Sequence, residues 1–110
     1  MSIMNDFYNA CLENDFDDIK LKGNVLNCNI RSFDNRYHLQ AVQKGSFLEL
    51  VLSDRMMFDI TPEVLDFLQK HGESSYPICR TVRSTDEIQD KLDELQSVAD
   101  DLFGFCHDLA

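Results

Sequence analysis

The last quarter of the chain has the most regular hydrophobic pattern, and it predicts one long amphipathic helix from Ser84 to Ala110. Apolar residues recur there at alternating intervals of three and four, the spacing that places side chains on one helical face. The charged positions carry eight Asp or Glu residues against Lys91 alone, so the helix has an apolar side and an acidic side. Ser84 and Glu87 have the spacing of a capping box that opens such a helix. The apolar stripe consists of Ile88, Leu92, Leu95, Ala99, Leu102, Cys106 and Leu109.

Two shorter helices are predicted, one from about Ser2 to Glu13 and one in the middle of the chain. The first has apolar residues at one- and four-residue intervals, which builds an apolar ridge on one side of a helix. The second begins at Thr61-Pro62-Glu63, where a hydroxyl, a proline ring and an acid each favour a helix start, and it ends at Gly72. Its inward-facing residues are expected to be Val64, Leu65, Phe67 and Leu68.

Between these two helices the period of the apolar residues changes to two, the pattern of strands with one buried face. Turns are expected at Gly23-Asn24, Asp34-Asn35 and Lys44-Gly45-Ser46, which divide the stretch from Ile19 to Leu52 into four strands. Met56 to Ile60 is a candidate for another strand, and Tyr76 to Val82 is expected to form the last one. We therefore predict an α+β fold: an antiparallel meander sheet with a short N-terminal helix, a middle helix and a long C-terminal amphipathic helix.

The length of 110 residues and the hydrophobic content of 44% predict a single α+β domain, residues 1–110, with one core. No apolar run approaches the ~20 residues that cross a bilayer. The N-terminus also lacks the basic and apolar regions of a signal peptide. We therefore expect a cytoplasmic protein that does not enter the membrane.

The net charge of −10 is concentrated at the two ends of the chain. Residues 19–83 hold nine Lys or Arg against seven acids, whereas residues 1–18 and the last helix are strongly acidic. A negative surface disfavours direct binding of nucleic acid and of anionic membranes. It favours a basic protein partner or serves solubility alone. The acids of the first segment are Asp6, Glu13, Asp15, Asp17 and Asp18.

The residue patterns offer no candidate catalytic, cofactor-binding or metal-binding residue. The four cysteines have no CxxC spacing, and buried reduced thiols are the expected state of those within apolar patterns. Cys106 and His107 are neighbours on the predicted helix, where side chains diverge by about 100°, so they are poorly placed as a nucleophile and base. The four glycines are isolated and form no phosphate-binding loop. We therefore predict a protein that is not an enzyme and needs no cofactor.

The order of elements, the small size and the acidic final segment from Thr85 to Leu109 resemble the type III secretion chaperones and the related YbjN-like domains. Those chaperones usually have a pair of strands between their last two helices, where this chain offers Tyr76 to Val82. The resemblance implies a dimeric, protein-binding module that holds an extended client segment along its sheet edges.

Two functions follow as hypotheses. The first is a non-enzymatic, chaperone- or adaptor-like module that binds a protein partner with a basic surface. The alternative is an acidic inhibitor, such as a phage anti-defence or immunity protein, whose carboxylates mimic a phosphate row and block the basic site of a nuclease or nucleic-acid-binding complex. Both use the acidic side of the last helix. The predicted partner-binding residues are Asp90, Asp93, Glu94, Asp100 and Asp101.

Homodimerisation is a further hypothesis, because the apolar stripe is longer than a compact domain of this size needs to cover. Gly104 lies between two phenylalanines and costs about 1 kcal/mol relative to Ala in a helix interior. Its missing side chain would let another backbone or a large ring approach, or the last turn would fray. The predicted dimer interface comprises Leu102, Phe103, Phe105 and Leu109.

Overall fold

The computed structural model describes residues 3–33, 35–54, 62–70, 72–73 and 77–109, of which 35, 54, 64 and 106–109 are described by their backbone only. The helices are α1 (Ile3–Glu13), α2 (Pro62–Lys70) and α3 (Ile88–Leu109), with a 3₁₀ turn η1 (Thr85–Glu87) before α3. The strands are β1 (Asp17–Lys22), β2 (Val25–Ser32), β3 (Asn35–Lys44), β4 (Phe47–Asp54) and β5 (Ile78–Val82). The predicted α+β class is confirmed. The candidate strand Met56 to Ile60 lies outside the described residues.

The described strands form one antiparallel sheet in the order β1-β2-β3-β4-β5, with β1 and β5 at its edges. Gly23 and Gly45, at φ 63°, supply the left-handed conformation that two of the tight turns require. Edge strand β1 is irregular, because its pairing with β2 shifts between Asp17 and Lys20. Asp18 adopts φ 52° at this bulge. Bulges and lysines of this kind protect a sheet edge from pairing with other chains.

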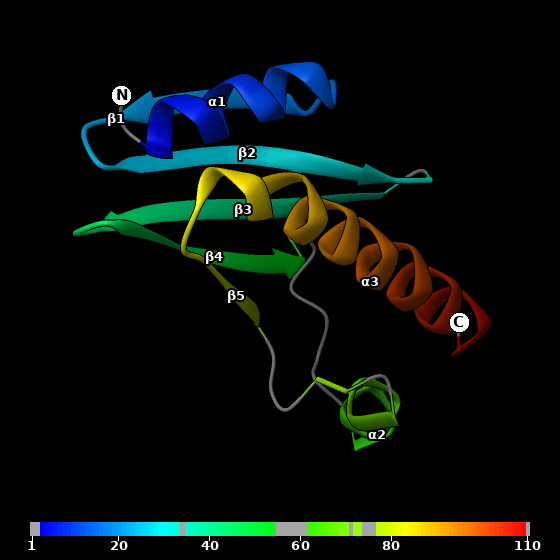
Figure 1. Cartoon of the computed structure of the whole chain (residues 1–110). Coiled ribbons are helices and arrows are strands. Elements are labelled where there is room, and N and C mark those ends of the chain that lie inside the picture. Colours follow the sequence, from blue (N-terminus) through cyan, green and yellow to red (C-terminus); the bar gives the residue numbers. More distant parts are fainter. Residues whose placement is uncertain (1–2, 34, 55–61, 71, 74–76, 110) are drawn as a thin grey trace.

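Helices α1 and α3 lie side by side on the same face of the sheet, which gives the molecule two layers (Figure 1). The C-terminal half of α3 extends beyond the strands, and α2 packs against it there (Figure 1). This overhang contributes to an elongated shape of 44 × 25 × 20 Å. Among the described elements, no helix covers the opposite face of the sheet.

The core lies between the helices and the covered face of the sheet, and it contains the predicted alternating residues of the strands. The stripe of α3 is buried as predicted from Ile88 to Leu102, while the side chains of Cys106 and Leu109 lie outside the described ones. Each fully buried leucine or phenylalanine contributes roughly 1.5–3 kcal/mol of hydrophobic free energy. The largest buried side chains include Phe7, Leu26, Ile30, Tyr37, Leu39, Leu48, Leu50, Leu52, Leu68, Leu92 and Leu95.

The turn between β2 and β3 differs from the prediction by one residue. Ser32 pairs with Asn35, so Asn35 is the first residue of β3 and Phe33 belongs to the turn. This register places Ile30 opposite Tyr37 and directs both side chains into the core. In this register Phe33 adopts φ 55°, a backbone conformation that a phenylalanine rarely takes.

Helix α2 ends as predicted at Gly72, which adopts φ 84°. The amide of Glu73 donates to the carbonyl of Leu68 (2.8 Å) and that of Gly72 to Gln69 (3.1 Å), the pair of bonds that defines a Schellman cap. Leu68 is buried as expected, but Leu65 is 39% exposed, so the prediction that it faces inward is wrong. Leu65 lies on the side of this short helix that no described element covers.

The start of α3 also differs from the prediction. Ser84 makes no side-chain capping bond, and the chain enters the helix through the 3₁₀ turn η1. The carboxylate of Glu87 reaches back as a capping box requires, but it accepts from the amide of Arg83 (2.8 Å) and not from that of Ser84. The capping-box prediction is therefore wrong for Ser84, because the 3₁₀ turn shifts the first α-helical residue to Ile88.

Candidate functional site

The charge of the molecule is separated between its two layers. Helices α1 and α3 together with η1 contain ten acidic residues and one basic residue, Lys91. Their net charge of −9 therefore accounts for nearly all of the chain's net charge of −10. The five strands contain six basic residues and four acidic ones. The helical layer is therefore the acidic side of the protein, a property that the linear charge pattern only partly predicts.

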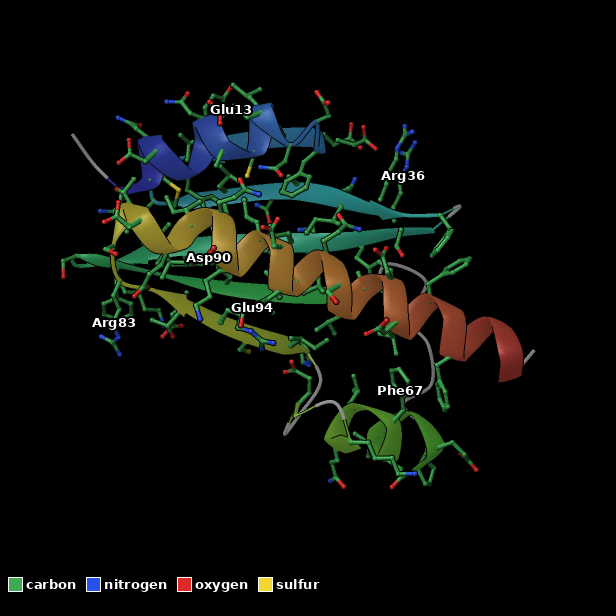
Figure 2. All side chains as sticks on the ribbon, turned by 45° about the vertical axis from the view of Figure 1, so that its right-hand side comes forward. Glu13, Arg36, Phe67, Arg83, Asp90 and Glu94 are labelled. Atoms are coloured by element: carbon green, nitrogen blue, oxygen red, sulfur yellow. The ribbon has the colours of Figure 1, made fainter. Side chains whose placement is uncertain are left out.

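A groove of about 260 Å³ lies in this layer, between α1 and the start of α3. One wall carries the carboxylates of Asp6 and Glu13, and Ala10 and Ile88 add apolar surface to the lining. The described residues that line it include no Lys or Arg. Figure 2 labels Glu13 on α1 and Asp90 on the neighbouring α3. The sequence alone did not reveal this groove, because it depends on the placement of α1 beside α3.

Hydrogen bonds join the two helices at both ends of the groove. At one end, the Thr85 hydroxyl donates to Asp6 Oδ2 (2.7 Å). At the other, the amides of Asn14 and Gln89 exchange two hydrogen bonds, of 3.0 and 3.1 Å. Gln89 Nε2 also donates to Asp93 Oδ1 (2.9 Å), which orients that carboxylate beside the groove. These contacts hold the two walls of the groove at a set separation.

Three of the five predicted partner-binding residues lie on the outer crest of α3, opposite its buried stripe. Asp90, Asp93 and Asp101 are exposed there. Asp90 and Asp93 fall within the helical turns that border the groove, and Asp101 lies two to three turns further along. Asp90 and Asp101 are 11 residues apart, so α3 displays these three carboxylates along a length of about 17 Å.

The other two predicted residues lie on opposite flanks of α3 and are engaged within the protein. Glu94 faces the β5 side, 3.2 Å from Lys91 and 4.0 Å from Arg80. Asp100 faces the β2 side, where it accepts from the buried hydroxyl of Ser32 (2.7 Å) and from Gln96 (3.1 Å). The structure therefore does not bring the five carboxylates together on one surface.

The predicted dimer residues are distributed differently from the expectation. Leu102 is buried, and the side chain of Leu109 lies outside the described ones. Phe103 stacks on Phe33 with ring centroids 5.0 Å apart, on the β2–β3 side of α3. Phe105 stacks on Phe67 of α2 at 4.4 Å, on the opposite flank (Figure 2). Part of the C-terminal apolar surface is therefore covered within the chain.

The open face of the sheet is mostly polar, with a few valines, and has a basic excess. Residues that pair directly share a face, so Lys20, Asn27 and Gln40 lie on the open side, as do Arg31 and Arg36. A depression of about 250 Å³ lies over β1 to β3. In it, the amide of Asn29 donates to Asp18 (3.0 Å), and His38 Nε2 lies 2.9 Å from Asn27 Oδ1. Its polar side chains thus largely satisfy one another.

Two cysteines meet in the core, between α1 and β2. Cys11 and Cys28 are buried and not joined by a disulfide. A hydrogen bond with the Cys28 thiol, together with burial, raises the pKa of Cys11 far above that of an ordinary thiol. Such a thiol stays protonated and is a poor nucleophile. The described residues contain no group of three or more His, Cys, Asp or Glu side chains arranged to hold a metal ion.

Among the described residues, no helix has the length and apolar character that crossing a membrane requires. Comparisons with protein-family models, with curated proteins and with solved structures each found no match for this chain. Its class of protein is therefore inferred from the charge separation and from the surfaces described above.

Proposed function

We propose that this protein is a non-enzymatic, chaperone- or adaptor-like protein-binding module whose helical layer binds a basic segment of a partner protein. The observation that carries the proposal is the separation of charge, with ten acids against Lys91 in α1, η1 and α3. A surface that served only solubility would be equally effective if acidic and basic residues were mixed on it. A one-signed surface steers oppositely charged partners toward it and raises their association rate.

The groove between α1 and α3 indicates which basic side chains would bind. Lys and Arg have long aliphatic stems, which can pack on Ala10 and Ile88 while the charged head reaches Asp6 or Glu13. An Arg head would make charge-assisted, bidentate hydrogen bonds with a carboxylate. Asp90 and Asp93 extend the same negative field along α3 for the following basic residues of the segment.

A labelled peptide of alternating Arg and Ala residues, titrated by fluorescence anisotropy, tests the proposal. Asp6→Asn with Glu13→Gln alters the groove, and Asp90→Asn with Asp93→Asn alters the crest. Exposed ion pairs contribute about 0.2–1 kcal/mol each, so each double variant should weaken binding about two- to thirtyfold. Raising the salt from about 0.1 M to about 1 M shortens the screening length from about 10 to about 3 Å and should abolish most of the affinity.

The matched control is Glu49→Gln with Asp66→Asn, which changes the net charge by the same amount on β4 and α2. Both control carboxylates are surface partners of lysines, Lys44 and Lys70. This variant should bind the peptide within about twofold of the unmodified protein. Equal weakening by the control, or binding that survives high salt, would mean that the acidic layer is only a solvated surface.

The alternative function, an acidic inhibitor of a nuclease or nucleic-acid-binding protein, is favoured by the spacing of acids along the crest of α3. Asp90, Asp93 and Asp101 lie on one side of a straight element, as a mimic of a phosphate row requires. If this reading holds, replacing these three by Asn should abolish inhibition of a basic nuclease assayed on duplex DNA. The groove variant should then leave inhibition unchanged, whereas the module that we propose depends on both surfaces.

A further inference from the structure

The two carboxylates that line the α1–α3 groove both come from α1. Asp6 and Glu13 are seven residues apart, which is almost two helical turns, so they lie on the same face of α1 with Ala10 between them. The rise of an α-helix sets the two positions about 10.5 Å apart along its axis. The lining residues described on η1 and α3 are uncharged. The spacing of the acids in the groove is therefore the spacing of one helix face.

This spacing favours a helical ligand over an extended one. In a helix, side chains at positions i and i+7 lie on one face and are also about 10.5 Å apart. In an extended segment the same distance corresponds to about three residues, and side chains three residues apart point to opposite sides. A helix with basic residues at i and i+7 therefore matches the positions of both Asp6 and Glu13, whereas an extended segment does not.

The walls of the groove favour a helix for a second reason. They are formed by α1 on one side and by η1 with the start of α3 on the other, and most backbone groups of helices are already hydrogen-bonded. An extended segment typically binds by pairing its backbone with the edge of a sheet. The described residues of the lining include none from the edge strands β1 and β5. A helix satisfies its own backbone and binds through its side chains.

The apolar part of the lining indicates what lies between the two basic residues of the ligand. Ala10 is half-buried on the α1 wall, and Ile88 is 3% exposed on the α3 wall, so both offer only a little apolar surface. A small apolar residue at i+3 or i+4 of the ligand would face Ala10. It would let the axis of the ligand helix approach α1 to the usual packing distance of about 8–10 Å.

We infer that the ligand of the α1–α3 groove is an α-helix of a partner protein, with basic residues at i and i+7 and a small apolar residue between them. The inference rests on the proposed function and deepens it, because it defines the conformation of the basic segment and the spacing of its charges. The Thr85 hydroxyl, which donates to Asp6 Oδ2 at 2.7 Å, orients one carboxylate for this contact. Arg suits both positions, since its guanidinium binds a carboxylate through two parallel hydrogen bonds.

Three alanine-rich peptides of equal length and charge test the inference. Each is titrated into the ¹⁵N-labelled protein, and the dissociation constant is measured from the NMR shifts. The first peptide has two arginines seven residues apart. The second has the same composition with the arginines five residues apart, which places them about 140° apart around the helix. The third is the first peptide with a proline at its centre, which breaks the helix.

The first peptide should bind about two- to fivefold tighter than the second and the third, because it alone makes both ion pairs at once. Glu13→Gln removes one of the two carboxylates, so it should bring the ratio between the first two peptides close to one. Asp90→Asn is the matched control, because Asp90 is an exposed acid of the same helical layer outside the groove. It should weaken both peptides alike and preserve their ratio.

The outcomes separate this inference from the proposed function. If the three peptides and the alternating Arg-Ala peptide all bind, but without a preference for the seven-residue spacing, the inference is wrong and the proposed function stands. A preference that persists in Glu13→Gln would also overturn the inference, because the acids of the groove would not be its cause. If none of the basic peptides binds, both the inference and the proposed function fail.

Discussion

Arg80 of β5 and Glu73, which follows α2 in the sequence, form a mostly buried ion pair that links the middle of the chain to the sheet. Arg80 Nη1 donates to Glu73 Oε2 at 3.0 Å, and Nη2 donates to Oε1, so the contact is bidentate. The two side chains are only 19% and 9% exposed. The hydrogen bonds with Glu73 raise the pKa of Arg80, which remains charged at all ordinary pH values. The Schellman cap at Gly72 positions Glu73 for this contact.

Replacing Glu73 by Gln should therefore destabilise the protein. The substitution keeps the shape of the side chain but leaves Arg80 as a poorly compensated charge, and breaking a buried pair costs about 3–5 kcal/mol. The residual exposure of Arg80 lowers the expected loss to about 1–3 kcal/mol. Urea unfolding measures it. Glu94→Gln is the control, because Glu94 lies 4.0 Å from Arg80 and is 46% exposed, so its loss should stay within about 0.5 kcal/mol.

Leu95→Ala should cost about 2–5 kcal/mol, since Leu95 is fully buried against the sheet. This is a large share of the total of about 5–15 kcal/mol expected for a small domain. Ser97→Ala, on the exposed crest of the same helix, is the matched control and should change stability by less than about 0.5 kcal/mol. A loss for Leu95→Ala below about 0.5 kcal/mol would show that the stripe of α3 is not core.

The Cys11 thiol should make stability fall at alkaline pH. Its pKa is raised in the folded state, so above the ordinary thiol pKa of about 8.5 the unfolded chain releases a proton that the folded chain retains. The stabilisation that comes from this pKa difference is fully present below that pH, and above it the free energy of unfolding declines by up to about 1.4 kcal/mol per pH unit. When the free energy of unfolding is measured from pH 8 to 11, its slope against pH should be shallower for Cys11→Ser than for the unmodified protein. Cys79→Ser, at an exposed site, should leave the slope unchanged.

The amide pair that closes one end of the groove should be energetically coupled. Asn14 and Gln89 exchange two hydrogen bonds, so Asn14→Ala, Gln89→Ala and the double variant form a thermodynamic cycle. A coupling of about 0.5–1 kcal/mol is expected for these exposed neutral bonds. A coupling near zero would mean that α1 and α3 are held together by their apolar contacts alone.

Much of the fold follows from the periodicity of the sequence. Alternation identified the inward residues of β2, β3 and β4, and the three-and-four spacing identified those of α3, because burial selects the same face at every repeat. The turn at Phe33 was misplaced because Asp34-Asn35 has the more usual turn chemistry. Strand pairing decided the matter, since only the observed register sets Ile30 opposite Tyr37 with both in the core.

By itself the sequence determined the class of fold, the buried stripe of α3 and the acidic excess of the helices, all of which depend on spacing and composition. The tertiary structure alone decided which acids contact other elements, because the flanks of a helix are defined by its neighbours. It directed Glu94 toward Arg80 and Asp100 toward Ser32, and it left Asp90, Asp93 and Asp101 on the crest. It also created the α1–α3 groove and set Phe33 against Phe103, contacts between residues far apart in the chain that no local pattern encodes.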